Sequence, residues 1–261
     1  MTSTMPAKAR NNKTPMWQTL LAVAFWVAVW QGLAVCIGHN GLFLATPLQT
    51  VQTLWRLLPT ADFWHRVGFS ALRILTGFVL AVTVGLLLGA CGARWRWFGT
   101  LVGPVMQLIR AMPVASFVIL ALLWVSGKNL SVIVSFTHVL PVVYAGTVGG
   151  IADTDPALLE MAKVYRLPLG KRLRYIWLPG MFPSFCENCI AAMGMCWKSG
   201  VSAEVIGLPD HSVGDALYRA KITISTPEVF AWTLVIVLLS ATLSTLAAWA
   251  LRRALCGEVE G

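Results

Sequence analysis

The stretch DPALLEMAKVYRLPLGKRLRYIWLPGMFP, residues 155–183, decides how the rest of this chain is arranged. It is the longest polar interruption in an otherwise apolar sequence. It contains five cations and two acids: Lys163, Arg166, Lys171, Arg172 and Arg174, with Asp155 and Glu160. Such a segment is excluded from hydrocarbon, because a charged side chain near the centre of a bilayer costs at least about 2.5–3.5 kcal/mol. We therefore expect this segment on the aqueous side of a membrane, in contact with a partner.

The pattern within this stretch predicts two short helices joined by a turn. Asp155 is suited to cap a helix that starts at a proline and runs to residue 165. A proline and a glycine then interrupt the helical pattern. A second, basic and aromatic helix is expected over 171–177, ending at Pro179.

Within this helix-turn-helix, the residues Glu160, Met161 and Ala162, followed by Ile176, Leu178 and Pro179, resemble the "EAA…G…I-LP" loop of ABC importer permeases. Ile176 and Pro179 follow Glu160 by 16 and 19 residues, which is the spacing of that family. The resemblance implies a coupling segment that docks in a groove of a cytoplasmic ATPase and transmits its closure. It assigns ATPase coupling to Glu160, Ala162, Arg166, Gly170, Ile176, Leu178 and Pro179.

Two positions depart from the family pattern. Met161 replaces the first alanine, and Arg166 stands where the family has a glycine. Because glycine readily adopts a positive φ, we expect the turn to differ here, with Gly170 taking over part of the role. The alternative hypothesis is a solvated basic loop that only sets topology.

The composition indicates an all-α integral membrane protein. Of the 261 residues, 57% are hydrophobic and only 12% are charged, and the mean hydropathy is +0.72; ordinary globular chains carry roughly 25% charged residues. The net charge of +9 arises from cations at the ends of apolar runs. That pattern is typical of topology signals and of contact with anionic membrane lipid, so nucleic-acid binding is not expected.

Six runs are apolar and long enough to cross a membrane at 1.5 Å per residue: residues 16–37, 67–91, 98–125, 130–151, 185–206 and 228–251. The first run is 22 residues long and is interpreted as an uncleaved span rather than a cleaved signal. In the second, Gly85-x-x-x-Gly89 predicts a close approach of another helix. Pro104, Pro113 and Pro141 are expected bend points.

Four regions follow from these runs. Residues 1–15 form a cytoplasmic tail, and 16–64 hold the first transmembrane helix and an outer surface segment with an amphipathic helix over 48–58. Residues 65–253 form the permease core, and 254–261 a second cytoplasmic tail. Residues 207–227 are expected as an outer loop.

The cations orient these six spans. Twelve lie on the side of the coupling segment, in the N-terminal tail, at Arg94 and Arg96, in the segment itself and at Arg252 and Arg253. Five lie on the other side: Arg56, Arg66, Lys128, Arg219 and Lys221. The positive-inside rule then makes both termini and the coupling segment cytoplasmic.

Three ionisable residues inside the spans are candidates for lining a translocation pathway: Arg110, Lys198 and Glu204. Arg110 lies between two prolines, and tying a broken helix together is an equal alternative for it. Lys198 and Glu204 are six residues apart, so we expect each to pair with another span or across a dimer axis. Trp-Lys-Ser-Gly at 197–200 and Ala-Glu-Val-Ile-Gly at 203–207 also resemble the nitrate/sulfonate/taurine-type branch of these permeases.

The six cysteines and four histidines suggest neither a cofactor nor a metal. Cys186 and Cys189 have CxxC spacing, but a second pair is missing, and small apolar fillers are the favoured interpretation. No nucleophile-base-acid set is apparent, which disfavours a membrane-embedded enzyme. The sequence also lacks the GxxxxGK[ST] phosphate loop, so this chain is not expected to hydrolyse ATP.

The family resemblance therefore implies a type I ABC importer permease in the cell (inner) membrane, working as a homodimer. Its implied partners are a cytoplasmic ABC ATPase subunit and a periplasmic or lipid-anchored solute-binding protein. The implied solute is small and anionic or organic, like a sulfonate, nitrate or taurine. The alternative is an ion-coupled secondary transporter or channel, which predicts intramembrane acids and inverted repeats.

Overall fold

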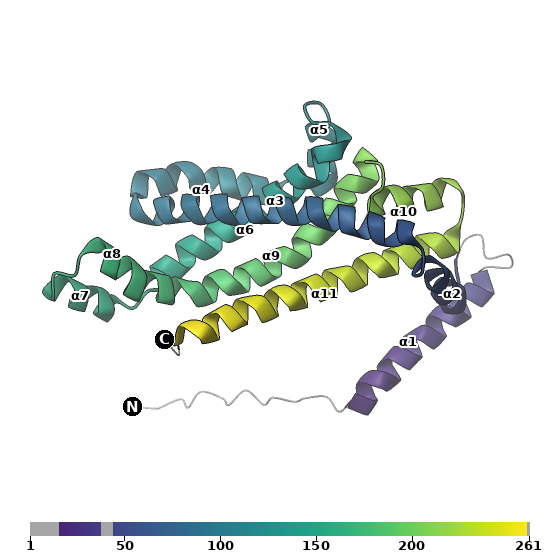
Figure 1. Ribbon diagram of the computed structural model, residues 1–261, viewed down its shortest axis with the longest axis horizontal. Helices are drawn as coiled ribbons and strands as arrows, with labels where there is room; N and C mark the ends of the chain where they lie inside the picture. The colour runs from purple at the N-terminus through teal and green to yellow at the C-terminus, as the bar shows by residue number, and fades with distance from the viewer. Residues whose placement is uncertain (1–15, 38–43, 260–261) are drawn as a thin grey trace, which may run out of the picture.

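The computed structural model describes residues 16–37 and 44–259, and these are helical with no strand among them, as predicted. The N-terminal tail predicted over 1–15 lies outside the described residues. Four long helices lie along the longest axis of the molecule (Figure 1): α3, α6, α9 and α11. Their bounds are Ala61–Arg94, Gly127–Ala152, Leu178–Gly207 and Thr226–Val259. α6 packs between α3 and α9, and α11 packs on α9.

The contact between α3 and α6 depends on glycines of α3. A side chain at Gly77 would overlap the carbonyl oxygen of Val132. At Gly89, a Cβ would lie 2.6 Å from the Cβ of Thr147, and at Gly85 one would lie 3.0 Å from Val143. The predicted small-x-x-x-small pair is therefore confirmed as a helix-helix contact.

The span predicted over 98–125 is wrong as a single helix. α4, Arg96–Ala111, and α5, Val114–Ala121, meet at an angle of 103°. The break lies at Met112 and Pro113, both with extended backbone (ψ 129° and 133°). A proline disfavours the helical conformation of the residue before it, which explains the position of the break. The helices continue through Pro104 in α4 and Pro141 in α6.

By length and composition, four described helices are apolar enough to cross a membrane: α1, α3, α6 and α11. Counting the bent pair α4–α5 as one span gives five. α9 has 30 residues but carries Glu187, Lys198 and Glu204 along its length. It packs against α6, α11 and α3, so much of its surface faces protein, where polar residues are tolerated.

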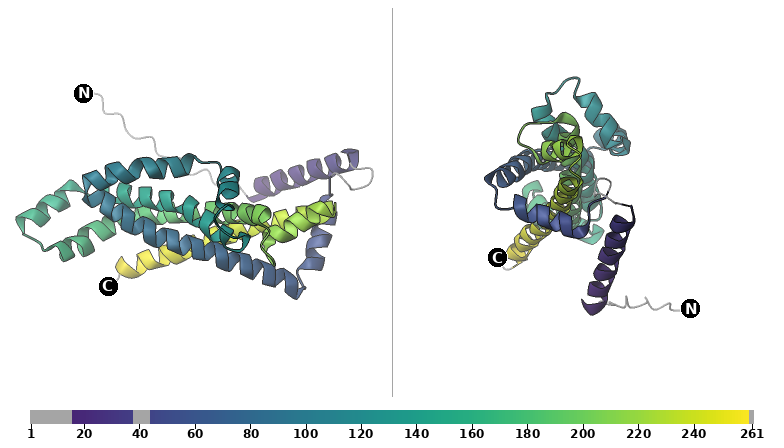
Figure 2. Two further views of the ribbon diagram at one scale, coloured as in Figure 1. Left: turned by 90° about the horizontal axis from the view of Figure 1, so that it is seen from above. Right: turned by 90° about the vertical axis from the view of Figure 1, so that its right-hand side faces the viewer.

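α1, Met16–Ile37, stands apart from the main bundle (Figure 2). Trp30 of α1 contacts the rest of the chain: its ring stacks on Phe230 of α11, with the ring centroids 5.6 Å apart. The indole N–H of Trp30 donates to the Ala45 carbonyl at 3.1 Å. The amphipathic helix expected over 48–58 is present as α2, Pro47–Leu57. A capping box between Thr46 and Gln49 starts α2.

Two expectations about loops are corrected. The outer loop expected over 207–227 contains a helix, α10, Val213–Ile222, which starts where the Ser212 hydroxyl caps the N–H of Asp215. The tail expected over 254–261 is helical as far as Val259, the end of α11.

The long helices divide the bundle into two ends (Figure 1). The turn between α3 and α4, the segment between α6 and α9, and the end of α11 lie at one end, and α2 and α10 lie at the other. The cations assigned to the inner side in the described part of the chain therefore gather at a single end.

The packing of α3 on α6 is testable with two matched glycines of α3. Gly77→Ala forces a methyl group against backbone and is expected to destabilise the protein by about 1–3 kcal/mol. Gly68→Ala places its methyl in open space and should be neutral or stabilising, because alanine favours a helix over glycine. Thermal unfolding of the detergent-purified variants measures both; an equal response of the two would contradict the close contact.

Candidate functional site

The segment between α6 and α9 begins with a capped helix. α7 spans Pro156–Val164, and a carboxylate oxygen of Asp155 accepts the Ala157 N–H at 2.8 Å, as predicted. Proline at the first helical position has no N–H that needs a partner there. The start of α7 is therefore determined by two neighbouring residues, the capping Asp155 and Pro156.

α7 ends in a Schellman motif centred on Arg166. The N–H of Leu167 donates to the Ala162 carbonyl at 3.0 Å, and the N–H of Arg166 donates to that of Lys163 at 3.1 Å. Arg166 itself is left-handed, with φ +48°. The left-handed turn that the family pattern assigns to glycine is thus present here with an arginine, at a strain of about 1–2 kcal/mol.

Gly170 does not take over this turn, contrary to expectation. It lies inside α8, Leu169–Arg172, in helical conformation. The turn is instead held by Arg172, whose guanidinium Nη2 donates to the Ala162 carbonyl at 3.1 Å. Ala162 and Ile176 are 1% and 5% exposed, so each half of the segment has one buried residue of the motif.

The second helix of the segment does not end at Pro179. α8 passes into a π-helical turn, Leu173–Trp177, and then directly into α9. The N–H of Leu178 donates to the Leu173 carbonyl, five residues back, and this π-helical turn directly precedes Pro179, which has no N–H to donate. α8, the π-helical turn and α9 therefore follow one another without a loop, whereas the turn at Arg166 separates α7 from them.

The exposed surface of α7 combines an acidic side chain with several large apolar side chains. Glu160 is exposed on α7, and large apolar side chains beside it are 43–78% exposed. These are Leu158, Met161, Val164 and Tyr165. A contiguous exposed apolar surface of this kind is typical of an interaction site.

The three intramembrane charges do not meet. Glu204 is fully buried; its Oε2 accepts the Ser70 hydroxyl at 2.7 Å and the Gly214 N–H at 3.3 Å. The Ser70 oxygen also accepts the Val213 N–H at 2.9 Å. Glu204 therefore joins α9 to α3 and to the start of α10, where the helix dipole favours a negative charge.

Arg110 and Lys198 are both exposed. Arg110 lines a cavity of about 180 Å³ between α4 and α6, together with Gln107 and Tyr144. Among the described residues neither cation forms an ion pair. Nor do these residues contain a group of three histidine, cysteine or acidic side chains able to hold a metal.

Sequence reasoning missed an ion-pair network at the α10 end. The Asp215 carboxylate contacts Arg66 of α3 at 3.0 Å and Arg219 at 2.8 Å, and Arg66 also contacts Asp62 at 2.6 Å. Two of these pairs, Asp62 with Arg66 and Asp215 with Arg219, have the i,i+4 spacing that indicates helical ion pairs. The link from Arg66 to Asp215 has no sequence signal, because 149 residues separate them.

Comparison with known proteins identifies relatives over most of the chain. The family described as "Binding-protein-dependent transport system inner membrane component" matches residues 67–254. A permease protein of Escherichia coli (strain K12) named for aliphatic sulfonates transport, SsuC, is 29% identical over 242 residues, covering 90% of each chain.

Two further relatives are named for other solutes. The nitrate import permease protein NrtB of Synechococcus elongatus is 23% identical, over 90% of this chain and 88% of its own. The taurine transport system permease protein TauC of Escherichia coli (strain K12) is also 23% identical, over 91% of this chain and 89% of its own. All three are similar in length to this chain.

Replacement of arginine by glycine is expected to change the stability of the segment in opposite directions at Arg166 and at Arg174. Arg166→Gly relieves the left-handed strain and should stabilise the segment by about 1 kcal/mol. Arg174→Gly removes an equal charge but places glycine in a helical turn, and should destabilise it by about 0.5–1 kcal/mol. Amide hydrogen exchange measures both: slower exchange of residues 160–167 is expected in the first variant, and faster exchange of residues 173–178 in the second. Faster exchange in Arg166→Gly would contradict the assigned backbone conformation.

Proposed function

This chain belongs to the family of binding-protein-dependent transport system inner membrane components, and on that premise we propose that it forms the solute pathway of an ATP-driven ABC importer. It is a multi-pass protein of the inner membrane, as the sequence predicted. ATP hydrolysis takes place on a separate ATPase subunit, because the sequence lacks a phosphate-binding loop.

The observation that carries this proposal is the exposed segment of α7 and α8 at one end of the bundle (Figure 1). The ATPase subunit covers the exposed apolar residues of α7 around Glu160. Ala162 and Ile176 are buried, so we assign them a structural role within this chain rather than contact with the partner. Arg166 forms the turn after α7, and Gly170 contributes only as a residue of α8. Leu178 and Pro179 form the start of α9.

Helical continuity explains how closure of the ATPase reaches the pathway. A displacement of α8 is transmitted through the π-helical turn to α9 without an intervening loop. α9 packs along α6, and α6 packs along α4 and α3. The pathway therefore changes shape through rigid helices, which is one of the established routes of alternating access.

We assign six spans to the chain, with α4 and α5 together as the third and α9 as the fifth. Both termini are then cytoplasmic. This assignment is supported by the gathering of cations at the α7–α8 end, because cytoplasmic loops carry an excess of lysine and arginine. α2 and α10 then lie on the outer side, where a periplasmic or lipid-anchored solute-binding protein docks.

The solute pathway is lined by Arg110 and Lys198, and its solute is small and anionic or organic, such as a sulfonate, nitrate or the zwitterion taurine. Three observations support this assignment: the cavity between α4 and α6 contains Arg110, Gln107 and Tyr144; Arg110 has no acidic partner among the described residues; and relatives are named for such solutes. Because Glu204 is buried, we propose that it anchors the start of α10 and does not contact the solute.

A homodimer completes the pathway, because Arg110 and Lys198 are exposed on the surface of a single chain, where a second copy can cover them. The alternative, an ion-coupled transporter or channel, requires an acid that can reach a cavity. Glu204, the acid deepest in the bundle, is instead fully buried and hydrogen-bonded. Family membership also favours the importer.

Charge reversal on α7 tests the ATPase contact. Tagged wild-type chain is expected to co-purify from its native membranes with an ABC ATPase, and Glu160→Arg should lose that subunit while still inserting. Asp210→Arg reverses an exposed acid at the opposite end and should retain it. Absence of any ATPase from the wild type would reject the importer proposal and favour ion-coupled transport.

Uptake measurements test the pathway cation. Arg110→Gln should lower uptake of a radiolabelled aliphatic sulfonate, taurine or nitrate by about tenfold or more, because a hydrogen bond to a charged group contributes about 1.5–3 kcal/mol. Arg110→Lys should retain part of it. Lys128→Gln, which removes an exposed cation from the start of α6, is the matched control. Full uptake by Arg110→Gln, with normal protein levels, would remove Arg110 from the pathway.

A further inference from the structure

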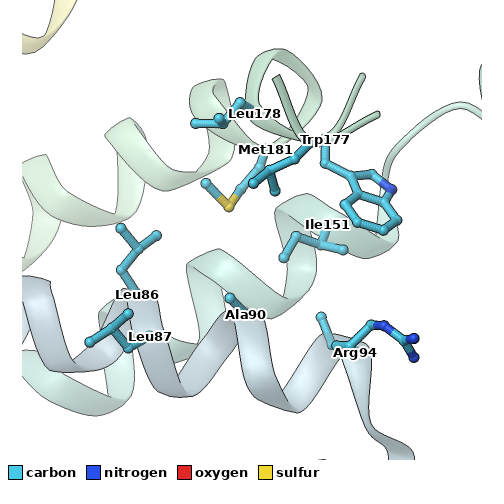
Figure 3. A pocket seen from close by; sticks show the side chains of 10 residues that line it. Leu86, Leu87, Ala90, Arg94, Ile151, Trp177, Leu178 and Met181 are labelled. Carbon is cyan, nitrogen blue, oxygen red and sulfur yellow. The ribbon is translucent and has the colours of Figure 1, made fainter. Parts of the chain in front are cut away.

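A large apolar pocket lies beneath the coupling segment and has no role in the function proposed above. It has a volume of about 490 Å³ and is bounded by α3, by the end of α6, and by the π-helical turn with the start of α9. Figure 3 shows Leu86 and Ala90 of α3 facing Met181 of α9, with Ile151 of α6 behind them. All of its lining residues except Arg94 are apolar or aromatic.

Arg94 and Trp177 stand together at one end of this pocket. In Figure 3 the guanidinium of Arg94 points away from the apolar wall, on the same side as the Trp177 indole. Within the described ranges Arg94 forms neither a hydrogen bond nor an ion pair, although it lies in the last turn of α3. Its positive charge is therefore available to a ligand.

The positions of Arg94 and Trp177 indicate at which depth in the membrane the pocket lies. α3 is long and apolar enough to cross a membrane, so its terminal turn lies near a membrane-water interface. Tryptophan is enriched at this depth because its ring is apolar and its N–H is polar. Arginine at the end of a span likewise holds its charge at the level of the head groups.

A ligand that fits this pocket needs two parts. The apolar walls require a hydrocarbon chain, since a pocket with almost no polar lining offers water no hydrogen-bond partners. The unpaired Arg94 at the open end requires an anion, and guanidinium matches the geometry of phosphate. One membrane component combines the two.

We propose that this pocket binds an acyl chain of an anionic phospholipid whose phosphate pairs with Arg94. The bound chain then lies against Leu173 and Trp177, residues of the π-helical turn that joins α8 to α9. The lipid therefore contacts the same helical turn through which a movement of the segment passes, so lipid composition sets the stability of that turn. This proposal does not depend on which solute is carried or on which ATPase binds.

The experiment compares lipids that differ only in head-group charge. Full-length chain is purified in detergent, stripped of lipid and mixed with phosphatidylglycerol or with phosphatidylcholine of the same acyl chains. Bound lipid is counted by native mass spectrometry, and the melting temperature is followed in parallel. The wild type should retain phosphatidylglycerol in preference to phosphatidylcholine and melt at a higher temperature with it; soluble glycerol phosphate should give no such shift.

Two pairs of variants locate the binding site. Arg94→Gln should lower the apparent affinity for phosphatidylglycerol about fivefold, the worth of one cation near an anionic surface. Arg96→Gln removes an equally exposed cation that does not line the pocket and should leave the affinity unchanged. Ala90→Trp fills the pocket and should abolish retention of both lipids, whereas Val79→Trp, exposed on α3 away from the pocket, should not.

Three results would overturn the proposal. Equal retention of the two lipids by the wild type would show that binding does not require an anionic head group. Equal losses in Arg94→Gln and Arg96→Gln would indicate general attraction to the basic end of the bundle. Normal lipid retention by Ala90→Trp, together with a change in its oligomeric state, would identify the pocket as a contact between two copies of the chain.

Discussion

The close contact of α6 with α3 on one side and α9 on the other is the constraint on which the rest of the structure depends. Helices in a bilayer gain little from hydrophobic association, because lipid tails are as apolar as leucine. They are held by close packing instead. Gly89 meets Thr147 of α6, Gly150 of α6 meets the backbone of Met181, and Gly200 of α9 meets Ile74 and Ser135. Each glycine leaves no space for a side chain, so the three axes have one arrangement.

This fixed core determines where the coupling segment can lie. The segment leaves α6 at Ala152 and returns as α9, two helices that already pack along their lengths. Within the segment, the Schellman turn at Arg166 and the hydrogen bond from Arg172 to Ala162 remove most of the remaining freedom. The left-handed backbone of Arg166 is held by the two hydrogen bonds that the Ala162 carbonyl accepts, from the Leu167 N–H and from Arg172.

Much of this architecture follows from the sequence, but its breaks and pairings do not. Apolar runs of 22 or more residues locate α1 and α3, and Asp155 locates the start of α7. Proline, by contrast, gives the same local signal at Pro104, which α4 absorbs, and at Pro113, where the helix breaks by 103°. The difference depends on neighbouring helices, which a single sequence does not display. The hydrogen bond between Ser70 and Glu204 joins residues 134 positions apart and is equally invisible.

The two ends of the bundle are held by different kinds of interaction, and this difference bears on movement. At the α10 end, Glu204 is buried against Ser70 and Gly214, and Asp215, which is 5% exposed, contacts Arg66. Separating the ends of α3 and α10 would break the ion pair between Arg66 and Asp215, although Asp215 would keep Arg219 and Arg66 would keep Asp62. At the α7–α8 end, the holding contacts are helix caps, apolar side chains and the hydrogen bond from Arg172 to the Ala162 carbonyl, beside an apolar pocket. In the proposed function, a force applied through the segment acts on the α7–α8 end, where the described residues form none of the ion pairs that hold the α10 end.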